Sequence, residues 1–214
     1  MESELIILHA KINLEKKMKS LLTTKTLFIS FILILLFMPL QHLSAHCDGL
    51  DGPVVKAARK ALETKNVNHV LIWVKAEDEQ TVRDAFTKTL KVRNINNKVK
   101  EFADMYFFET VVRIHRQREG EQYTGLKPAG RDLGPVVPAA DKSIEIESFT
   151  PVHEVFSRKK LGDAEIESLF KNVIETKNFD PNDIEAGRKF VDAYVTYIHL
   201  AEEAFENPDR KHSH

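Results

Sequence analysis

The stretch GPVVKAARKALE at residues 52–63 returns in altered form as GPVVPAADKSIE at residues 134–145. The offset is 82 residues. After a shift of two residues the match resumes at an offset of 84, where His115 pairs with His199. A self-match of this kind predicts two copies of one structural unit.

Apolar residues recur at spacings of three and four through both copies, which is the period of an amphipathic helix. One such run is Ile166, Leu169, Phe170, Val173 and Ile174. No stretch alternates as a strand does. The predicted fold class is therefore all-α, a helical bundle built from an internal duplication of a helical unit.

Each copy is predicted to contain two short helices, a third of about four turns, and a long helix that ends near its histidine. The segment DPND at 180–183 predicts a helix start, with Asp180 as N-cap and Pro181 at the first helical position. We expect the two units to pack about a pseudo-twofold axis, with the apolar stripes of their long helices buried against each other.

The first 45 residues have the pattern of a signal peptide, with lysines before an apolar run at 27–40 that is shorter than the ~20 residues of a spanning helix. We expect cleavage after Ala45 and a periplasmic or secreted protein. A true start at Met18 and an uncleaved membrane anchor are the alternatives. The mature chain divides into repeat 1 at 46–118, a Gly/Pro-rich connection at 119–133, repeat 2 at 134–206 and a flexible tail at 207–214, with 46–206 as one globular domain.

Charge and cysteine content limit the classes of binding partner that the sequence predicts. The chain has 31 Lys+Arg and 32 Asp+Glu, and without residues 1–45 it keeps 26 and 29. A mildly acidic chain gives no sign of nucleic-acid binding, and no membrane contact is expected after cleavage. Cys47 is the single cysteine. In an exported protein it points to a partner, a reactive thiol or a metal ion.

Cleavage after Ala45 would create a metal site. The free amine of His46, the amide nitrogen of Cys47 and its sulfur could chelate in one plane, which favours Ni(II) or Cu(II). We predict His46, Cys47, Asp48 and Asp51 as metal-site residues. The alternative is that Cys47 is a small residue near a helix start, capped by Asp48 or Asp51.

His115, His199 and Glu202 are further candidates. The two histidines occupy equivalent positions of the repeat and should approach each other across the pseudo-twofold axis. Glu202 lies three residues after His199, within reach of its ring on one helix face. Alternatively, each histidine lies at the edge of the core. The segment RQREGE at 116–121 is interpreted as a solvated helix end.

Two parts of the sequence resemble known proteins, one over most of the mature chain and one over seven residues. From His46 to about Phe205 the chain resembles an exported bacterial family of unknown function, whose mature chains begin HCD and carry DGPVVKAARKALETKNV, YFFETVVRIHR, YTGLKPAG and EAGRKFVDAYVTYIH. Locally, HCDGLDG at 46–52 is similar to the nickel hook of nickel superoxide dismutase. That resemblance implies ligation by His46 and Cys47. It departs at Asp51, where the hook has its second cysteine.

The sequence thus predicts an exported helical protein that binds Ni or Cu through its processed amino terminus. Redox activity of the superoxide dismutase type is one hypothesis, and a non-catalytic metal carrier or sensor is another. In a third, the protein is a helical interaction domain that displays the YTGLKPAG loop. The sequence does not decide whether the protein is an enzyme.

Overall fold

The computed structural model describes residues 46–208, and within this range it contains helices and no strand. The all-α prediction is therefore confirmed. By their contacts, the described residues belong to one compact unit. The predicted signal peptide, the cleavage after Ala45 and most of the tail lie outside the described residues. Between residues 46 and 208, no helix combines the length and the apolar character needed to cross a membrane.

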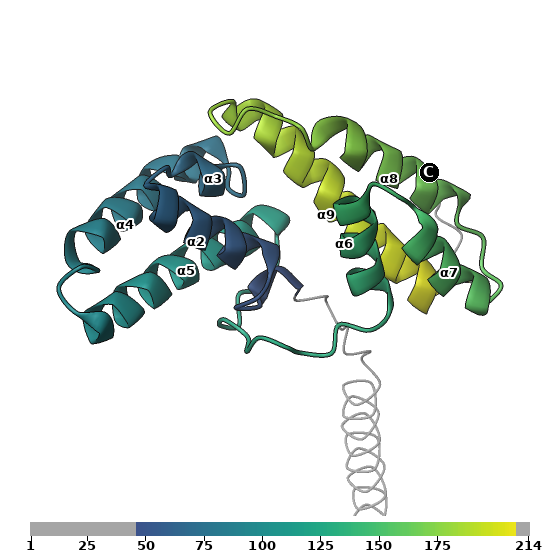
Figure 1. The fold of residues 1–214 in the computed structure, drawn as a ribbon, viewed down its shortest axis with the longest axis horizontal. Coiled ribbons are helices and arrows are strands. Elements are labelled where there is room, and N and C mark those ends of the chain that lie inside the picture. The colour runs from purple at the N-terminus through teal and green to yellow at the C-terminus, as the bar shows by residue number, and fades with distance from the viewer. Residues whose placement is uncertain (1–45, 209–214) are drawn as a thin grey trace, which may run out of the picture. The chain divides into compact units, whose positions relative to one another are not determined.

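The described helices fall into two halves that follow each other along the chain (Figure 1). The first half consists of η1 (His46–Asp48), α2 (Pro53–Thr64), α3 (Asn68–Leu71), η2 (Ala76–Asp78), α4 (Glu79–Val92) and α5 (Asn97–Glu119). The second half consists of α6 (Val136–Ile146), α7 (Thr150–Arg158), α8 (Ala164–Thr176) and α9 (Ile184–Glu206). Each half ends in a helix of 23 residues. This order agrees with the predicted repeat, while a common origin of the halves stays a prediction.

The two long helices begin at side-chain caps. Asn96 accepts a hydrogen bond from the Val99 amide at 3.0 Å, and Asp183 accepts one from the Ala186 amide at 2.9 Å. The prediction of Asp180 as the N-cap is wrong, because the N-cap of α9 is Asp183, three residues later. The carboxylate of Asp180 instead accepts from the Asn182 amide at 2.8 Å, which closes a turn ahead of α9. An aspartate that bonds its own backbone two residues on favours such a turn over a helix start.

Each long helix packs within its own half. Helix α5 lies against α2 and α4, and α9 lies against α6 and α8. Phe107 and Val111 of α5 are fully buried in this packing. The expectation that α5 and α9 bury their apolar stripes against each other is therefore wrong. Their facing sides instead carry polar residues such as Arg118 and Asp192, which line a pocket between the two helices.

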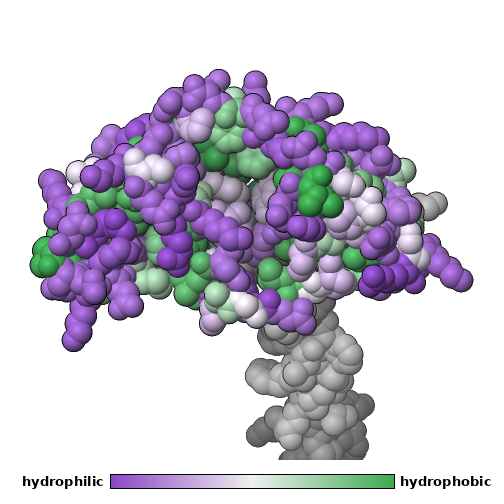
Figure 2. Space-filling view, viewed as in Figure 1, coloured by the Kyte–Doolittle hydropathy of each residue, from purple (hydrophilic) through white to green (hydrophobic). Residues whose placement is uncertain are grey.

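The face shown in Figure 2 is mainly hydrophilic and is hollowed between the first half and α9. Among the described residues, the most exposed large apolar side chains are Phe102 and Ile95, which lie where α4 passes into α5. Scattered exposed apolar side chains are normal for a folded protein.

Candidate metal centre

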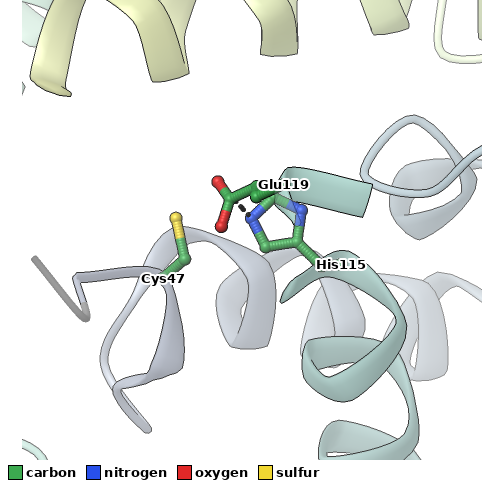
Figure 3. A group of neighbouring side chains, drawn as sticks. All are labelled: Cys47, His115 and Glu119. Carbon is green, nitrogen blue, oxygen red and sulfur yellow. Dashed lines mark ion pairs between the residues drawn. The ribbon is translucent and has the colours of Figure 1, made fainter. Parts of the chain in front are cut away.

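Three side chains with metal-binding atoms meet beside α5. One ligand atom each from Cys47, His115 and Glu119 lies within 4.8 Å of the others (Figure 3). Cys47 comes from the η1 turn, while His115 and Glu119 are four residues apart on α5 and share one face. Cys47 and His115 are buried, and the Glu119 side chain is 9% exposed. A sulfur, a nitrogen and an oxygen donor are thus brought together on largely buried side chains.

The backbone determines which nitrogen of His115 is available. Nδ1 lies 2.9 Å from the carbonyl oxygen of Trp73. Because a carbonyl can only accept, Nδ1 must carry the proton, and Nε2 of the neutral ring then presents a lone pair. That Nε2 lies 3.2 Å from Glu119 Oε1, yet neither buried atom has a hydrogen-bond partner within the described residues. Two acceptors that face each other are satisfied only when a proton lies between them, or when a donor or a metal ion lies beside them.

Arg116 orients the carboxylate of Glu119. Its Nη1 donates to Glu119 Oε2 at 2.8 Å, which leaves Oε1 turned toward His115. Burial raises the pKa of Glu119, but a His115 ring that carries a second proton, together with Arg116, outweighs burial and lowers that pKa overall. The Nε of Arg116 lies 3.4 Å from Asp48 Oδ1. The predicted ligand Asp48 thus faces a guanidinium, and burial, the largest influence, raises its pKa.

The η1 turn holds Cys47 against α5. Burial, reinforced by the charge of Glu119, raises the pKa of the Cys47 thiol well above its usual range. A bound metal ion reverses this preference, because a coordinating thiol is deprotonated. Gly52 makes the turn feasible, since a Cβ there would lie 2.4 Å from the carbonyl oxygen of His46 and 3.3 Å from that of Cys47.

The loop that connects α5 to α6 holds the η1 turn in place through hydrogen bonds. The Lys127 amide donates to the Asp48 carbonyl at 2.9 Å, and the Leu50 amide donates to the Lys127 carbonyl at 3.0 Å. The carboxylate of Asp51 accepts from the Gly130 amide at 2.7 Å. Asp51, another predicted ligand, is therefore exposed and engaged by the loop. The N-cap of α2 is Gly52, without a side-chain hydrogen bond, so neither aspartate caps this helix.

The ring of His46 points toward the second half of the fold. Its Nε2 lies 3.2 Å from Asp141 Oδ2 on α6. Tyr194 of α9 donates to Asp141 Oδ1 at 2.8 Å and lies 3.5 Å from His46 Nδ1. Both ring nitrogens thus have neighbours in this cluster. A role of the His46 amine in metal binding stays a prediction.

His115 and His199 line one pocket of about 390 Å³ between α5 and α9, which Glu119 also borders. Burial is the main cause of a lowered pKa at His199, so its ring is neutral near pH 7 and can act as a ligand. Glu202 lies further along α9, where its charge acts on Tyr194. It is not part of the group of three.

Sequence reasoning missed Glu119. The sequence predicts a solvated helix end at 116–121, but the structure buries Arg116 and leaves the side chain of Glu119 only 9% exposed. One signal was present, because Glu119 follows His115 by four residues and must share its helix face.

Comparison with known proteins gives one match. No curated protein and no solved structure matches the chain. None of these comparisons links the chain to nickel superoxide dismutase. The model of DUF6448, a family of unknown function, matches residues 51–200, a range that includes His115, Glu119 and His199 and begins after Cys47. The chain therefore belongs to the family of unknown function DUF6448.

Proposed function

We propose that this protein binds a transition-metal ion through Cys47 Sγ, His115 Nε2 and the Glu119 carboxylate. The observation that carries the proposal is the pair of buried acceptors, His115 Nε2 and Glu119 Oε1, beside the only cysteine. Leaving one buried polar atom without a partner costs about 1–3 kcal/mol. A metal ion would satisfy both atoms at once.

The donor set selects the class of ion. Thiolate and imidazole are ligands of zinc, copper and nickel, whereas calcium and magnesium take oxygen ligands. Three protein ligands with a position left open are typical of catalytic zinc sites. The chelate predicted from the sequence instead uses the amine of His46 and favours Ni(II) or Cu(II). The two ligand sets share Cys47 and differ in His115 and Glu119.

A purely structural explanation competes with this proposal. A protonated His115 would pair with Glu119 and satisfy both atoms without a metal ion. Cys47 would then be a small buried side chain that fills the space beside them. This explanation predicts no specific metal uptake.

Calorimetry with Zn(II), Ni(II) and Cu(II), together with metal analysis of the purified protein, separates these explanations. We expect one ion per chain, and a large loss of affinity in Cys47→Ser, His115→Gln and Glu119→Gln. His153→Gln is the matched control, because His153 is an exposed histidine that pairs with Asp163. Binding that is equally strong in His115→Gln and in the wild type would reject the side-chain site.

Acetylation of the amino-terminal amine distinguishes the two ligand sets. If affinity survives acetylation and is lost in Glu119→Gln, the side-chain set holds the ion. The opposite result favours the chelate at His46. Export and cleavage after Ala45 belong to the proposal as well, and mass spectrometry of the mature amino terminus tests them.

Superoxide dismutation is a narrower hypothesis, which the similarity of HCDGLDG to the nickel hook supports. It predicts turnover by the nickel-loaded protein that disappears in Cys47→Ser. Activity no greater than that of free nickel would remove it. A carrier or sensor would take up metal without turnover, and an interaction domain would behave unchanged after deletion of residues 46–51.

A further inference from the structure

The proposed metal centre lies at the boundary between the two halves of the fold. Cys47, His115 and Glu119 all belong to the first half. The opposite wall of the adjoining pocket comes from α9 and includes Asp192, Val195 and His199. A ligand from that wall would connect the halves through the ion.

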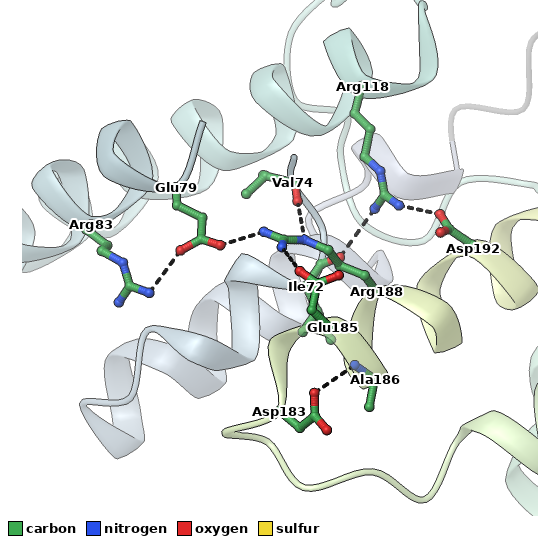
Figure 4. A network of polar contacts seen from close by, with 10 residues as sticks. All are labelled: Ile72, Val74, Glu79, Arg83, Arg118, Asp183, Glu185, Ala186, Arg188 and Asp192. Atoms are coloured by element: carbon green, nitrogen blue, oxygen red, sulfur yellow. Dashed lines mark hydrogen bonds and ion pairs between the residues drawn. The ribbon is translucent and has the colours of Figure 1, made fainter. Parts of the chain in front are cut away.

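Long side chains provide polar links between the halves beside this pocket (Figure 4). Arg188 of α9 donates to the Val74 carbonyl at 3.1 Å and pairs with Glu79 at 2.7 Å. Arg118 of α5 pairs with Asp192 of α9. These links leave the pocket itself open between α5 and α9.

Most polar groups on the pocket wall already have partners. Arg118 and Asp192 pair with each other, and the Glu121 carboxylate lies 3.8 Å from Arg116 Nη2. Within residues 46–208, no hydrogen bond to the His199 ring is found, and the charge of Glu119 acts on this ring. His199 therefore presents an unused imidazole to the pocket that adjoins the three proposed ligands.

We infer that His199 is the fourth protein ligand of the ion, so that metal binding clamps α9 onto α5. This inference rests on the proposed metal binding. The His199 ring is not in the group of atoms within 4.8 Å. Ligation thus requires the ring or α9 to move inward, which narrows the pocket. The clamp joins residues 84 positions apart in the sequence, at the two histidines of the predicted repeat.

X-ray absorption at the zinc edge of the Zn(II)-loaded wild-type protein tests the ligand count directly. We expect one sulfur and two imidazole nitrogens, because His115 and His199 both bind. In His199→Gln one imidazole should be lost while one ion still binds, with a dissociation constant weakened about tenfold or more. His153→Gln should retain both imidazoles and the wild-type affinity.

Hydrogen exchange along α9 gives a second measurement that needs no variant. Zn(II) should slow exchange around His199 in the wild type, and this effect should disappear in His199→Gln. A wild-type spectrum with a single imidazole, or an unchanged affinity in His199→Gln, overturns the clamp and leaves the proposed function standing. If the wild type takes up no Zn(II), Ni(II) or Cu(II), the proposed function fails, and the clamp fails with it.

Discussion

Helix α5 carries a buried charged cluster near each end, and the two clusters differ in how fully their atoms are paired. Near its start, Asp104 accepts from Arg93 Nε at 2.8 Å and from Arg93 Nη2 at 3.0 Å. Lys100 adds a contact at 2.7 Å. Near its end, His115 Nε2 and Glu119 Oε1 are buried and make no hydrogen bond within residues 46–208. The side chains that the fold supplies pair every charged group of the first cluster, while the second keeps two buried atoms, His115 Nε2 and Glu119 Oε1, that no described side chain hydrogen-bonds.

This difference separates a structural cluster from a candidate binding site. Both contain a carboxylate and a cationic neighbour on the same helix. Burial alone would raise the pKa of Asp104. The hydrogen bonds from Arg93 and Lys100 outweigh this effect, so the pKa of Asp104 is lowered overall. The carboxylate of Glu119 uses only Oε2 for Arg116. An unused buried acceptor is costly unless a ligand uses it.

The largest expected effect comes from breaking the cluster of Arg93, Lys100 and Asp104, in which every charged group is paired. Asp104→Ala leaves the mostly buried Arg93 without its partner, so the free energy of unfolding should fall by roughly 3–4 kcal/mol. Urea denaturation measures this loss. The control is Asp84→Ala, since Asp84 is exposed and its change should stay within about 0.5 kcal/mol. Equal losses in the two variants would show that the Asp104 cluster is not structural.

For the cluster of His115 and Glu119, a bound metal ion should change the free energy of unfolding more than mutation alone does. In wild-type protein, an ion at one hundred times its dissociation constant should add about 2.7 kcal/mol to the free energy of unfolding. Glu119→Gln should abolish this gain and change the metal-free stability by only about 1 kcal/mol, because Arg116 can still donate to the amide oxygen. Thermal or urea unfolding with and without Zn(II) tests both statements. A gain that persists in the variant contradicts them.

The turn that presents Cys47 should be sensitive to one added methyl group. Gly52→Ala would place a Cβ 2.4 Å from the His46 carbonyl oxygen, so we expect a loss of about 2 kcal/mol together with weaker metal binding. Gly162→Ala is the matched control, because nothing lies within 4 Å of its Cβ position. Urea denaturation and calorimetry should separate the two variants, and similar behaviour would argue against a tight turn.

The smallest expected effect concerns Lys100, the exposed member of the cluster around Asp104. The Lys100 side chain is 50% exposed, so its pair with Asp104 is well screened by solvent. Lys100→Gln should lower the free energy of unfolding by only about 0.5 kcal/mol. A loss in urea denaturation as large as that of Asp104→Ala would assign the stability to Lys100 rather than to Arg93.

Local spacing predicted the helical class and several individual positions. The run from Ile166 to Ile174 lies in α8, and the histidine of each predicted long helix lies in the last part of α5 or α9. Spacing failed where a side chain had two local choices. Asp180 could start a helix or close a turn, and the turn is what the structure contains.

The candidate site was only partly visible in the sequence. Cys47 was singled out because it is alone, and His115 because it recurs as His199. Glu119 was missed because the charged segment around it looks solvated. Its burial depends on Arg116 and on the η1 turn, which lies about 70 positions earlier in the sequence.

The sequence by itself therefore determined the helices and singled out the cysteine and the paired histidines, because periodicity and composition act over a few residues. Only the tertiary structure decided which of these groups meet. It turned the ring of His46 toward Asp141, engaged Asp51 with the connecting loop, and brought Cys47 to His115 and Glu119. Long-range contacts decide such pairings, because the chain must close large loops before distant donors can share one buried space.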